Sequence, residues 1–244
     1  MELDDTLKSK VAAYQPAKSV VDLLNTTPVL LLVAISGGGK DTIKHRLLAT
    51  GNYHHIISYT TRAPRGNDGV MEQDGVDYHF IDFDTATGML ERGEYIESDL
   101  YANNIYGTGV ADIVAAQNEH KIAITDITIE GAFHYLELAP PVKVVFLLPP
   151  SFEIWMQRLL SRYNDNTLNP HDKRLRLQEA ITEIKEAIDD DDMYIVINDD
   201  LEKTVQLVDD IAHNKPVEPH YHKAVVIAEE ILHHIQAELA ELEQ

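Results

Sequence analysis

A glycine-rich segment between residues 34 and 41 carries the residue types that bind phosphate. It reads Ala34-Ile-Ser-Gly-Gly-Gly-Lys-Asp41, it follows an apolar run, and a helical pattern begins at Lys40. In such a loop, consecutive backbone N–H groups can close around phosphate oxygens while the helix N-terminus adds its dipole. A flexible glycine turn is the alternative. We expect a nucleotide to be bound by Ser36, Gly37, Gly38, Gly39, Lys40, Asp41 and Thr42.

Asp41 stands where loops of this kind carry Ser or Thr, whose hydroxyl binds Mg²⁺. A carboxylate is a good ligand for a hard cation, although its charge opposes phosphate binding when no metal is present. Thr42 is no simple substitute, because one helical step turns its side chain by about 100°. Ala34 replaces the first glycine of the loop, which requires a negative φ at that residue. The sequence predicts Asp41 as a metal ligand and leaves open whether it supports full activity.

A second group of polar and aromatic residues lies between residues 58 and 110. Arg62 and Arg65 are three residues apart, and their guanidinium groups could grip a dianionic phosphate in bidentate fashion. Tyr78 and Tyr106 could donate hydroxyl hydrogen bonds to the same group. Each of these residues alone would more often be a surface charge or a core aromatic. Together they indicate a binding site for a phosphorylated acceptor.

Three arginines flank a polar segment that contains Pro170. Arg158 and Arg162 precede residues 163–173 and Arg174 follows them, an arrangement that suits a mobile lid. Arginines delivered by a lid can stabilise the charge that phosphoryl transfer spreads over the equatorial oxygens. The alternative is that Arg158 and Arg162 line a solvated helix face.

Asp126 ends an apolar run, and functional groups gather where parallel strands end. We expect this carboxylate to take part in catalysis by holding the waters around Mg²⁺ or by orienting a water. The alternative is an Asp that caps a helix.

Four short apolar runs predict the strands that would position these residues, at 28–35, 122–127, 142–148 and 194–197. They alternate with helical patterns, which predicts an α/β fold with a parallel sheet flanked by helices. Residues 58–110 are rich in Gly, Tyr, Thr and charge, so we expect a small inserted β-rich subdomain. Residues 1–27 are expected to form a polar, weakly helical lead-in. Residues 214–244 are expected to add an amphipathic helix, whose apolar stripe must be buried on the main body or across a homodimer.

The chain has 41 acidic and 20 basic residues and a formal charge of −21. Nucleic acids and anionic membranes need a basic surface, so neither is expected as a partner. The longest apolar stretch, residues 29–35, is far shorter than the ~20 residues of a membrane helix. The first residues lack the basic and apolar parts of a signal peptide, and cysteine is absent. We therefore expect a cytoplasmic protein that acts on small molecules.

The order of these motifs resembles the guanylate kinase family. The resemblance covers about residues 28–213, and its motifs are Ser58-Tyr-Thr-Thr-Arg62-Ala-Pro-Arg65, Asp74-Gly-Val-Asp77-Tyr78-His-Phe80, Gly93-Glu-Tyr-Ile-Glu97, Tyr106-Gly-Thr108, Ile124-Thr-Asp126, Leu147-Leu-Pro-Pro-Ser151 and Asn198-Asp-Asp200. It implies a P-loop NTPase fold with an acceptor-binding subdomain at 58–110 and a lid at 155–175. It also implies in-line transfer of a phosphoryl group from ATP to GMP or dGMP, with Mg²⁺ as cofactor.

The resemblance implies roles for individual residues as well. Guanine would be bound by Ser58, Glu97 and Thr108, the acceptor phosphate by the arginines and tyrosines named above, and adenine would lie near Asn198. Thr128, also expected near GMP, replaces a second carboxylate of the family, and the loop of residues 66–74 looks longer than usual. Two alternatives stay open. One is a binding module with weak catalysis, and the other is a kinase of a phosphorylated sugar.

Overall fold

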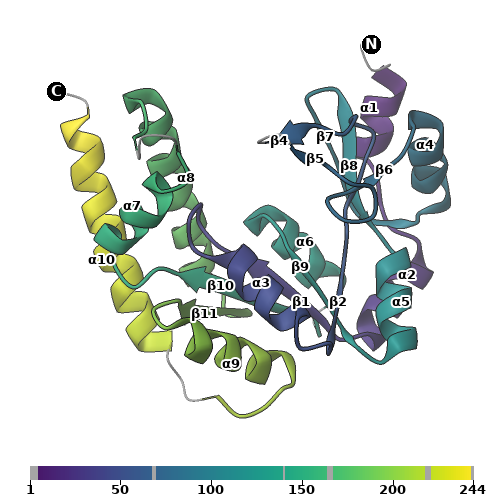
Figure 1. Ribbon diagram of the computed structural model, residues 1–244. Helices are drawn as coiled ribbons and strands as arrows, with labels where there is room; N and C mark the ends of the chain where they lie inside the picture. The colour runs from purple at the N-terminus through teal and green to yellow at the C-terminus, as the bar shows by residue number, and fades with distance from the viewer. Residues whose placement is uncertain (1–4, 68–69, 140, 164–166, 218–220, 243–244) are drawn as a thin grey trace. The chain divides into compact units, whose positions relative to one another are not determined.

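Residues 5–67, 70–139, 141–163, 167–217 and 221–242 are described by a computed structural model of the chain (Figure 1). Contacts divide the chain into two compact units, and each unit is described by itself. Unit 1 comprises Met1–Val29, Asn52–Thr125 and Phe133–Val142, and unit 2 comprises Leu30–Gly51, Asp126–Ala132 and Lys143–Gln244.

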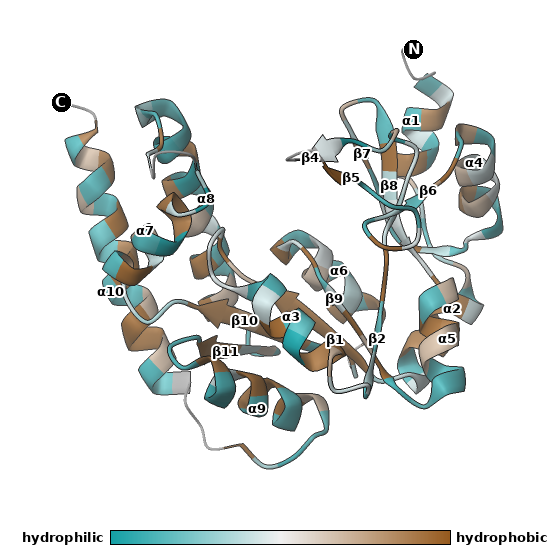
Figure 2. Ribbon diagram, viewed as in Figure 1, coloured by the Kyte–Doolittle hydropathy of each residue, from teal (hydrophilic) through white to brown (hydrophobic). Residues whose placement is uncertain are grey.

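Five strands form a sheet in the order β11-β10-β1-β9-β2. Their bounds are β1 (Val29–Val33), β2 (Tyr53–His55), β9 (Ile122–Asp126), β10 (Lys143–Leu148) and β11 (Met193–Ile197). The pairs β1–β10, β10–β11 and β2–β9 are parallel. Every residue of β1 is buried, and Figure 2 shows how apolar this strand and its neighbours are. Strands covered on both faces need such continuous apolar runs, and the predicted α/β fold with a parallel sheet is confirmed.

Unit 2 places a helix after each of its strands. Loops lead from β1 to α3 (Lys40–Leu48), from β10 to α7 (Phe152–Leu160) and from β11 to α9 (Leu201–Ala212). The side chain of Ser151 caps α7 by accepting the N–H of Ile154. Helix α8 (Pro170–Asp189) begins with Pro at its first position and with Asn169 as its cap. The helix therefore begins inside the segment 155–175 that was expected to form the lid, and residues 170–175 of that segment are helical.

Unit 1 is built on a four-stranded sheet in the order β6-β3-β8-β7. Its strands are β3 (Tyr59–Thr60), β6 (His79–Phe80), β7 (Tyr95–Tyr101) and β8 (Asn104–Gly109), and a separate hairpin joins β4 (Gly66–Asn67) to β5 (Val70–Met71). The helices are α1 (Asp5–Ala12), α2 (Lys18–Thr26), α4 (Phe83–Arg92) and α5 (Ala111–Glu119), and α6 (Ile129–Leu138) contributes its later residues. The described residues of the long loop noted in the sequence, 66–74, include β4 and β5.

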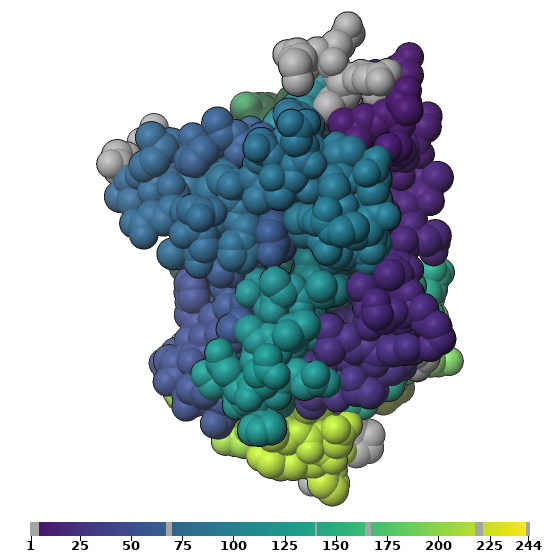
Figure 3. Space-filling view, turned by 90° about the vertical axis from the view of Figure 1, so that its right-hand side faces the viewer, coloured from purple at the N-terminus to yellow at the C-terminus, as the bar shows by residue number. Residues whose placement is uncertain are grey.

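The N-terminal segment is part of the core of unit 1. Val11 of α1 is buried in a cluster with Leu90, Tyr95 and Ile105, and Figure 3 shows the N-terminal helices lying against the residues of α4 and the sheet. The hydroxyl of Tyr14 donates a hydrogen bond of 2.6 Å to the backbone oxygen of Tyr95. The segment expected as a polar lead-in therefore carries an apolar face that unit 1 buries.

Helix α10 (Tyr221–Glu241) packs on α8, β11 and α7 within unit 2. Its buried side chains are Ala224, Ala228, Ile231, Leu232 and Ile235. Lys173 of α8 donates a hydrogen bond to Glu238, and His234 stacks on Phe152 with ring centroids 5.6 Å apart. The apolar side of α10 is therefore buried on the main body, which is one of the two locations expected for it. Within the described ranges, no helix combines the length and apolar character that crossing a bilayer requires.

Shortening Ile235 to alanine is expected to lower the free energy of unfolding by about 2–5 kcal/mol, because it leaves a cavity under α10. Val226→Ala on the same helix is the matched control, since Val226 is 40% exposed and should change stability by about 0.5 kcal/mol or less. Urea unfolding measures both variants. Equal effects at the two positions would contradict the packing of α10 on unit 2.

Candidate active site

The glycine loop of unit 2 encloses a cavity of about 210 Å³. Its walls are residues 34–40 of the loop together with Arg162, Arg176, Glu179, Ala180 and Glu183. Gly39 has a φ of +98°, and a Cβ there would lie 2.3 Å from Nδ2 of Asn198, so this position requires glycine. Ala34 is not among the residues with positive φ. Alanine can therefore take the place of the first glycine of the loop.

Two side chains brace this loop directly, and a third side chain holds one of these two residues. Nδ2 of Asn198 donates to the backbone oxygen of Gly38 at 2.9 Å, and Nε1 of Trp155 donates to that of Ser36 at 2.8 Å. Nη1 of Arg158 donates to the backbone oxygen of Asn198 at 3.0 Å. Asn198 and Arg158 were expected to contact ATP and the reacting phosphate. In the structure the side chain of Asn198 holds the loop and Arg158 holds the backbone of Asn198, and neither is among the described residues of the cavity wall.

Two arginines of the predicted lid region, Arg162 and Arg176, line the cavity. Arg174 is not among the described residues of the cavity wall, and its catalytic role stays a prediction. Because Arg174 and Arg176 both lie on α8, a separation of two residues turns their side chains about 200° apart. Arg176, Glu179 and Glu183 share one face of the helix through spacings of three and four residues.

Glu183 lines the cavity with an altered acidity. Burial raises its pKa to about 7, and although Lys40 lowers the pKa, the negative charges of Glu179 and Glu130 add to the rise. A carboxyl group with this pKa is partly protonated at neutral pH. The cavity therefore carries less negative charge than its residue types suggest, which favours an anionic ligand.

Asp126 lies between two lysines of α3. Its Oδ1 is 2.5 Å from Nζ of Lys44 and its Oδ2 is 3.5 Å from Nζ of Lys40. Burial acts to raise the pKa of Asp126, but the hydrogen bond and charge of Lys44 and the charge of Lys40 outweigh it, so the pKa is lowered. The carboxylate is thus ionised and strongly held. It is a tightly paired group, and its catalytic role and the alternative of a helix cap both stay predictions.

Asp41 faces a lid arginine. Its Oδ2 lies 3.6 Å from Nη2 of Arg162, and both side chains are about half exposed. Within the described ranges, no three acidic or histidine side chains gather closely enough to hold a metal by themselves. Mg²⁺ in kinases takes most of its ligands from phosphates and water and one or two from carboxylates, so Asp41 and Asp126 fit this ion as donors.

The acceptor side lies in unit 1 and centres on Arg62. Its Nη1 and Nη2 donate to the two carboxylate oxygens of Glu72 at 2.8 and 3.0 Å, and its Nε donates to the hydroxyl of Tyr106 at 3.1 Å. The guanidinium carbon lies 5.2 Å from the ring centroid of Tyr78. The hydrogen bonds to Glu72 raise the pKa of Arg62. These contacts fix the orientation of a cation that is only 8% exposed.

Glu97 is the main polar group among the residues expected to bind guanine. The hydroxyl of Thr108 donates to its Oε1 at 2.6 Å, and burial raises the pKa of Glu97 although Thr108 opposes the rise. The hydroxyl of Tyr135 is buried without a hydrogen-bond partner among the described atoms. Burial first, and then the charge of Glu97, raises the pKa of Tyr135. Glu97 therefore places a partly buried carboxylate, held by Thr108 at one oxygen, in unit 1.

The remaining predicted residues have simpler surroundings. The backbone of Arg65 pairs with Glu72 while its side chain is exposed, and Ser58 accepts the N–H of His79 at its backbone oxygen. The hydroxyl of Thr128 in unit 2 accepts the N–H of Gly131 at 3.2 Å and so caps α6. Thr42 is exposed on α3. None of these contacts tests a role in substrate binding, and those roles stay predictions.

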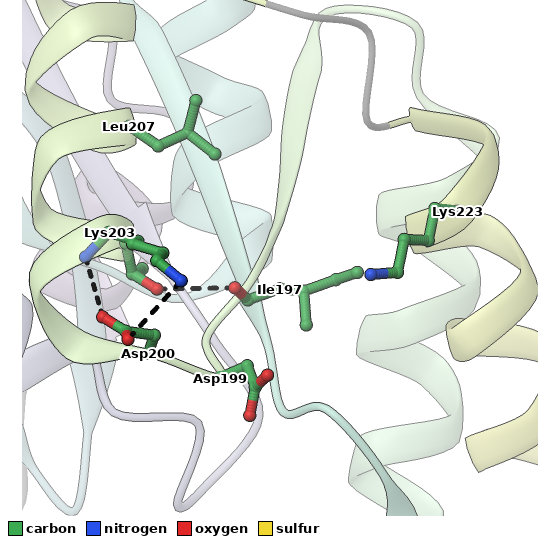
Figure 4. Close-up of a pocket in the computed structure, with 7 residues that line it drawn as sticks. Ile197, Asp199, Asp200, Lys203, Leu207 and Lys223 are labelled. Carbon is green, nitrogen blue, oxygen red and sulfur yellow. Dashed lines mark hydrogen bonds and ion pairs between the residues drawn. The ribbon is translucent and has the colours of Figure 1, made fainter.

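A second cavity, of about 290 Å³, lies in unit 2 beside the Asn198 segment (Figure 4). Ile197 and Asp199 of this segment, the first turns of α9 and Lys223 of α10 line it. Lys203 is held near Asp200, with Nζ 3.9 Å from Oδ2. The side chain of Asn198 is used on the glycine loop, whereas its two neighbours line this cavity.

Sequence reasoning missed several residues of the two units, among them Lys44, Glu72, Tyr135 and Arg176. The spacing of Arg176 from Glu179 and Glu183 was a usable signal, because it matches one helix face. Lys44 could have been suspected from its place one turn after Lys40. Glu72 and Tyr135 carry no such signal, since their partners are distant in the sequence.

The comparisons with known proteins agree in one family. Residues 26–215 match the family model of guanylate kinase. The guanylate kinase of Myxococcus xanthus is 38% identical over 176 residues, which cover 72% of this chain and 80% of that protein. The guanylate kinase of Desulfotalea psychrophila is 33% identical over 190 residues, 77% and 89% of the two chains.

A solved structure extends this likeness to the fold. The crystal structure of guanylate kinase from Anaplasma phagocytophilum matches with a TM-score of 0.55 and 25% sequence identity, covering 80% of this chain and 89% of that one. The family match spans most of the chain, and it includes the glycine loop of unit 2 and the acceptor residues of unit 1. The chain therefore belongs to the guanylate kinase family of enzymes, which phosphorylate GMP with ATP.

Proposed function

We propose that this enzyme transfers the γ-phosphate of Mg·ATP directly to the phosphate of GMP or dGMP, giving the nucleoside diphosphate and ADP. The observation that carries the proposal is the cavity of the glycine loop, whose wall includes Arg162 and Arg176. A module that only binds a ligand has no need of two arginines beside a phosphate loop. A phosphoryl transferase needs them to stabilise charge on the equatorial oxygens.

Each unit supplies one substrate site in this proposal. In unit 2, the backbone N–H groups of residues 36–39 and the ammonium of Lys40 hold the phosphates of ATP. In unit 1, Arg62, Tyr78 and Tyr106 bind the phosphate of the acceptor, with Arg65 as a further cation. Glu97 and Thr108 receive guanine, because a carboxylate can accept both the N1–H and the N2–H of that base. A base lacking these donors would leave Glu97 buried and unpaired.

Transfer needs no covalent intermediate in this arrangement. The acceptor phosphate attacks in line, and Lys40, Arg162 and Arg176 balance the charge that spreads over the transferred group. Mg²⁺ bound to ATP would neutralise phosphate charge. Asp41 and Asp126 are the carboxylates that would hold the metal ion or its bound waters. We retain Asn198 and Arg158 as supports of the loop shape, since that is how their hydrogen bonds are used.

An assay of ADP release tests the proposal across GMP, dGMP, AMP, CMP, UMP and a sugar phosphate, with Mg²⁺ or Mn²⁺ in excess. Turnover with GMP or dGMP well above that with the others is the expected result. Turnover with only the sugar phosphate would favour the sugar kinase, and no turnover with any acceptor would sink the kinase assignment.

Asp41→Asn is expected to raise the Mn²⁺ concentration needed for half-saturation by roughly tenfold or more, because an amide replaces a charged oxygen ligand. Electron paramagnetic resonance of free Mn²⁺ in the presence of ADP measures the binding without turnover. Asp189→Asn, at the exposed end of α8, serves as the control and should leave the affinity unchanged. If Asp41→Asn also leaves it unchanged, Asp41 is not a metal ligand.

A further inference from the structure

Lys44 is a buried lysine that the proposed reaction does not use. Its side chain is 11% exposed, and its Nζ lies 2.5 Å from Oδ1 of Asp126. Lysine is almost never buried without a partner, because its charge must be taken out of water. Lys44 is not among the described residues that line the phosphate cavity. Its ammonium therefore acts on Asp126.

Lys40 and Lys44 share this one carboxylate. They lie four residues apart on α3, so both side chains leave the same face of the helix. Lys40 reaches the other oxygen of Asp126 at 3.5 Å and also lines the phosphate cavity. Lys40 thus stands between two anionic partners, Asp126 and a nucleotide phosphate.

The electrostatics of Asp126 decide how freely Lys40 can turn to the phosphate. The Asp126 side chain is only 23% exposed, so leaving its charge uncompensated would be costly. With Lys44 in place, the carboxylate keeps a close counter-ion when Lys40 moves. Without Lys44, the ion pair between Lys40 and Asp126 would remain, and it would hold Lys40 on the carboxylate.

We propose that Lys44 is a positioning residue, the standing counter-ion of Asp126 that releases Lys40 to bind the nucleotide phosphates. The proposal rests on the proposed function only in assigning Lys40 to those phosphates. Lys44 also adds a positive charge three residues after Asp41, and so partly offsets the negative charge that Asp41 brings to the start of α3.

The test uses the full chain and measures ADP affinity by calorimetry in EDTA, so that no metal contributes. Lys44→Met keeps the length of the side chain and removes its charge. We expect ADP affinity to fall about tenfold, and KM for ATP to rise in parallel while KM for GMP changes less than about twofold. Lys44→Arg should restore most of the affinity. Lys185→Met, on an exposed position of α8, is the control and should have no effect.

The double variant separates positioning from general damage. In an Asp126→Asn background the carboxylate of the Lys40 ion pair is gone, so adding Lys44→Met should change ADP affinity by less than about threefold. Asp126→Asn alone should raise ADP affinity in EDTA, a result that needs no folded Lys44→Met protein. Equal losses from Lys44→Met in both backgrounds would overturn the proposal, as would an unchanged or lowered affinity in Asp126→Asn.

A failure of the proposed function would look different. If Lys40→Met leaves ADP affinity unchanged, Lys40 does not bind the phosphates and the assignment of the ATP site is wrong. If Lys40→Met weakens ADP binding but Lys44→Met does not, the ATP site stands and only the role of Lys44 is refuted.

Discussion

Arg176→Ala is expected to lower kcat with ATP and GMP by about a thousandfold, the contribution typical of an arginine that stabilises the transferring phosphoryl group. Arg176 lines the cavity of the glycine loop, and Arg162 is the other arginine of its described wall. KM for GMP should change little, because that substrate is assigned to unit 1. Steady-state kinetics with ATP and GMP varied separately measures the effect.

Arg174→Ala is the matched control for this prediction. It makes the same substitution on the same helix, two residues away, at an exposed position outside the described cavity wall. Alanine is a good helix former, so neither variant should disturb α8. We expect Arg174→Ala to keep kcat within about threefold. The reverse pattern, a large loss of kcat in Arg174→Ala and a small loss in Arg176→Ala, would show that Arg174 and not Arg176 contacts the transferred phosphoryl group.

Glu97→Gln is expected to lower kcat/KM for GMP by about a hundredfold, because a charged acceptor that is partly buried becomes a neutral amide. Its carboxylate already accepts the Thr108 hydroxyl at 2.6 Å, which leaves its remaining acceptor sites for N1–H and N2–H of guanine. The preference for GMP over AMP should fall with it, since discrimination depends on those donors. Competition between the two acceptors in one assay gives the ratio directly.

The acidity of Glu97 adds a second readout. Burial raises its pKa above the ordinary carboxyl value, so protonation sets in at a higher pH than for a surface Glu. Since the protonated form cannot accept both guanine donors, kcat/KM for GMP should fall on acidification through this raised pKa. Glu97→Gln should abolish this acid limb. Glu94→Gln, whose carboxylate is paired with Arg92, should keep both the limb and the preference, and an unchanged preference in Glu97→Gln would refute the base assignment.

The sequence alone was sufficient for features that depend on local pattern. The apolar runs of β1, β9, β10 and β11 predicted a parallel sheet, because strands buried on both faces leave no polar alternation. The glycine loop could also be predicted from a local pattern, because phosphate binding by backbone N–H groups needs glycines at a strand-to-helix junction. β2 escaped prediction because it is three residues long and includes two histidines. These features lie within one or two elements, where neighbours in sequence are neighbours in space.

Only the tertiary structure decided which residues of unit 2 hold the glycine loop and line its cavity. The buried face of α8, with Leu177, Ala180 and Ile184, sets the rotation of that helix, and this rotation places Arg176 and not Arg174 in the described cavity wall. Asn198 and Arg158 brace the loop across long sequence separations, and Asp126 meets Lys44 in the same way. In unit 1, Glu72 holds Arg62 from the turn after the β4–β5 hairpin. Such contacts depend on which side chains folding brings within hydrogen-bond distance, and no local periodicity in the sequence encodes that.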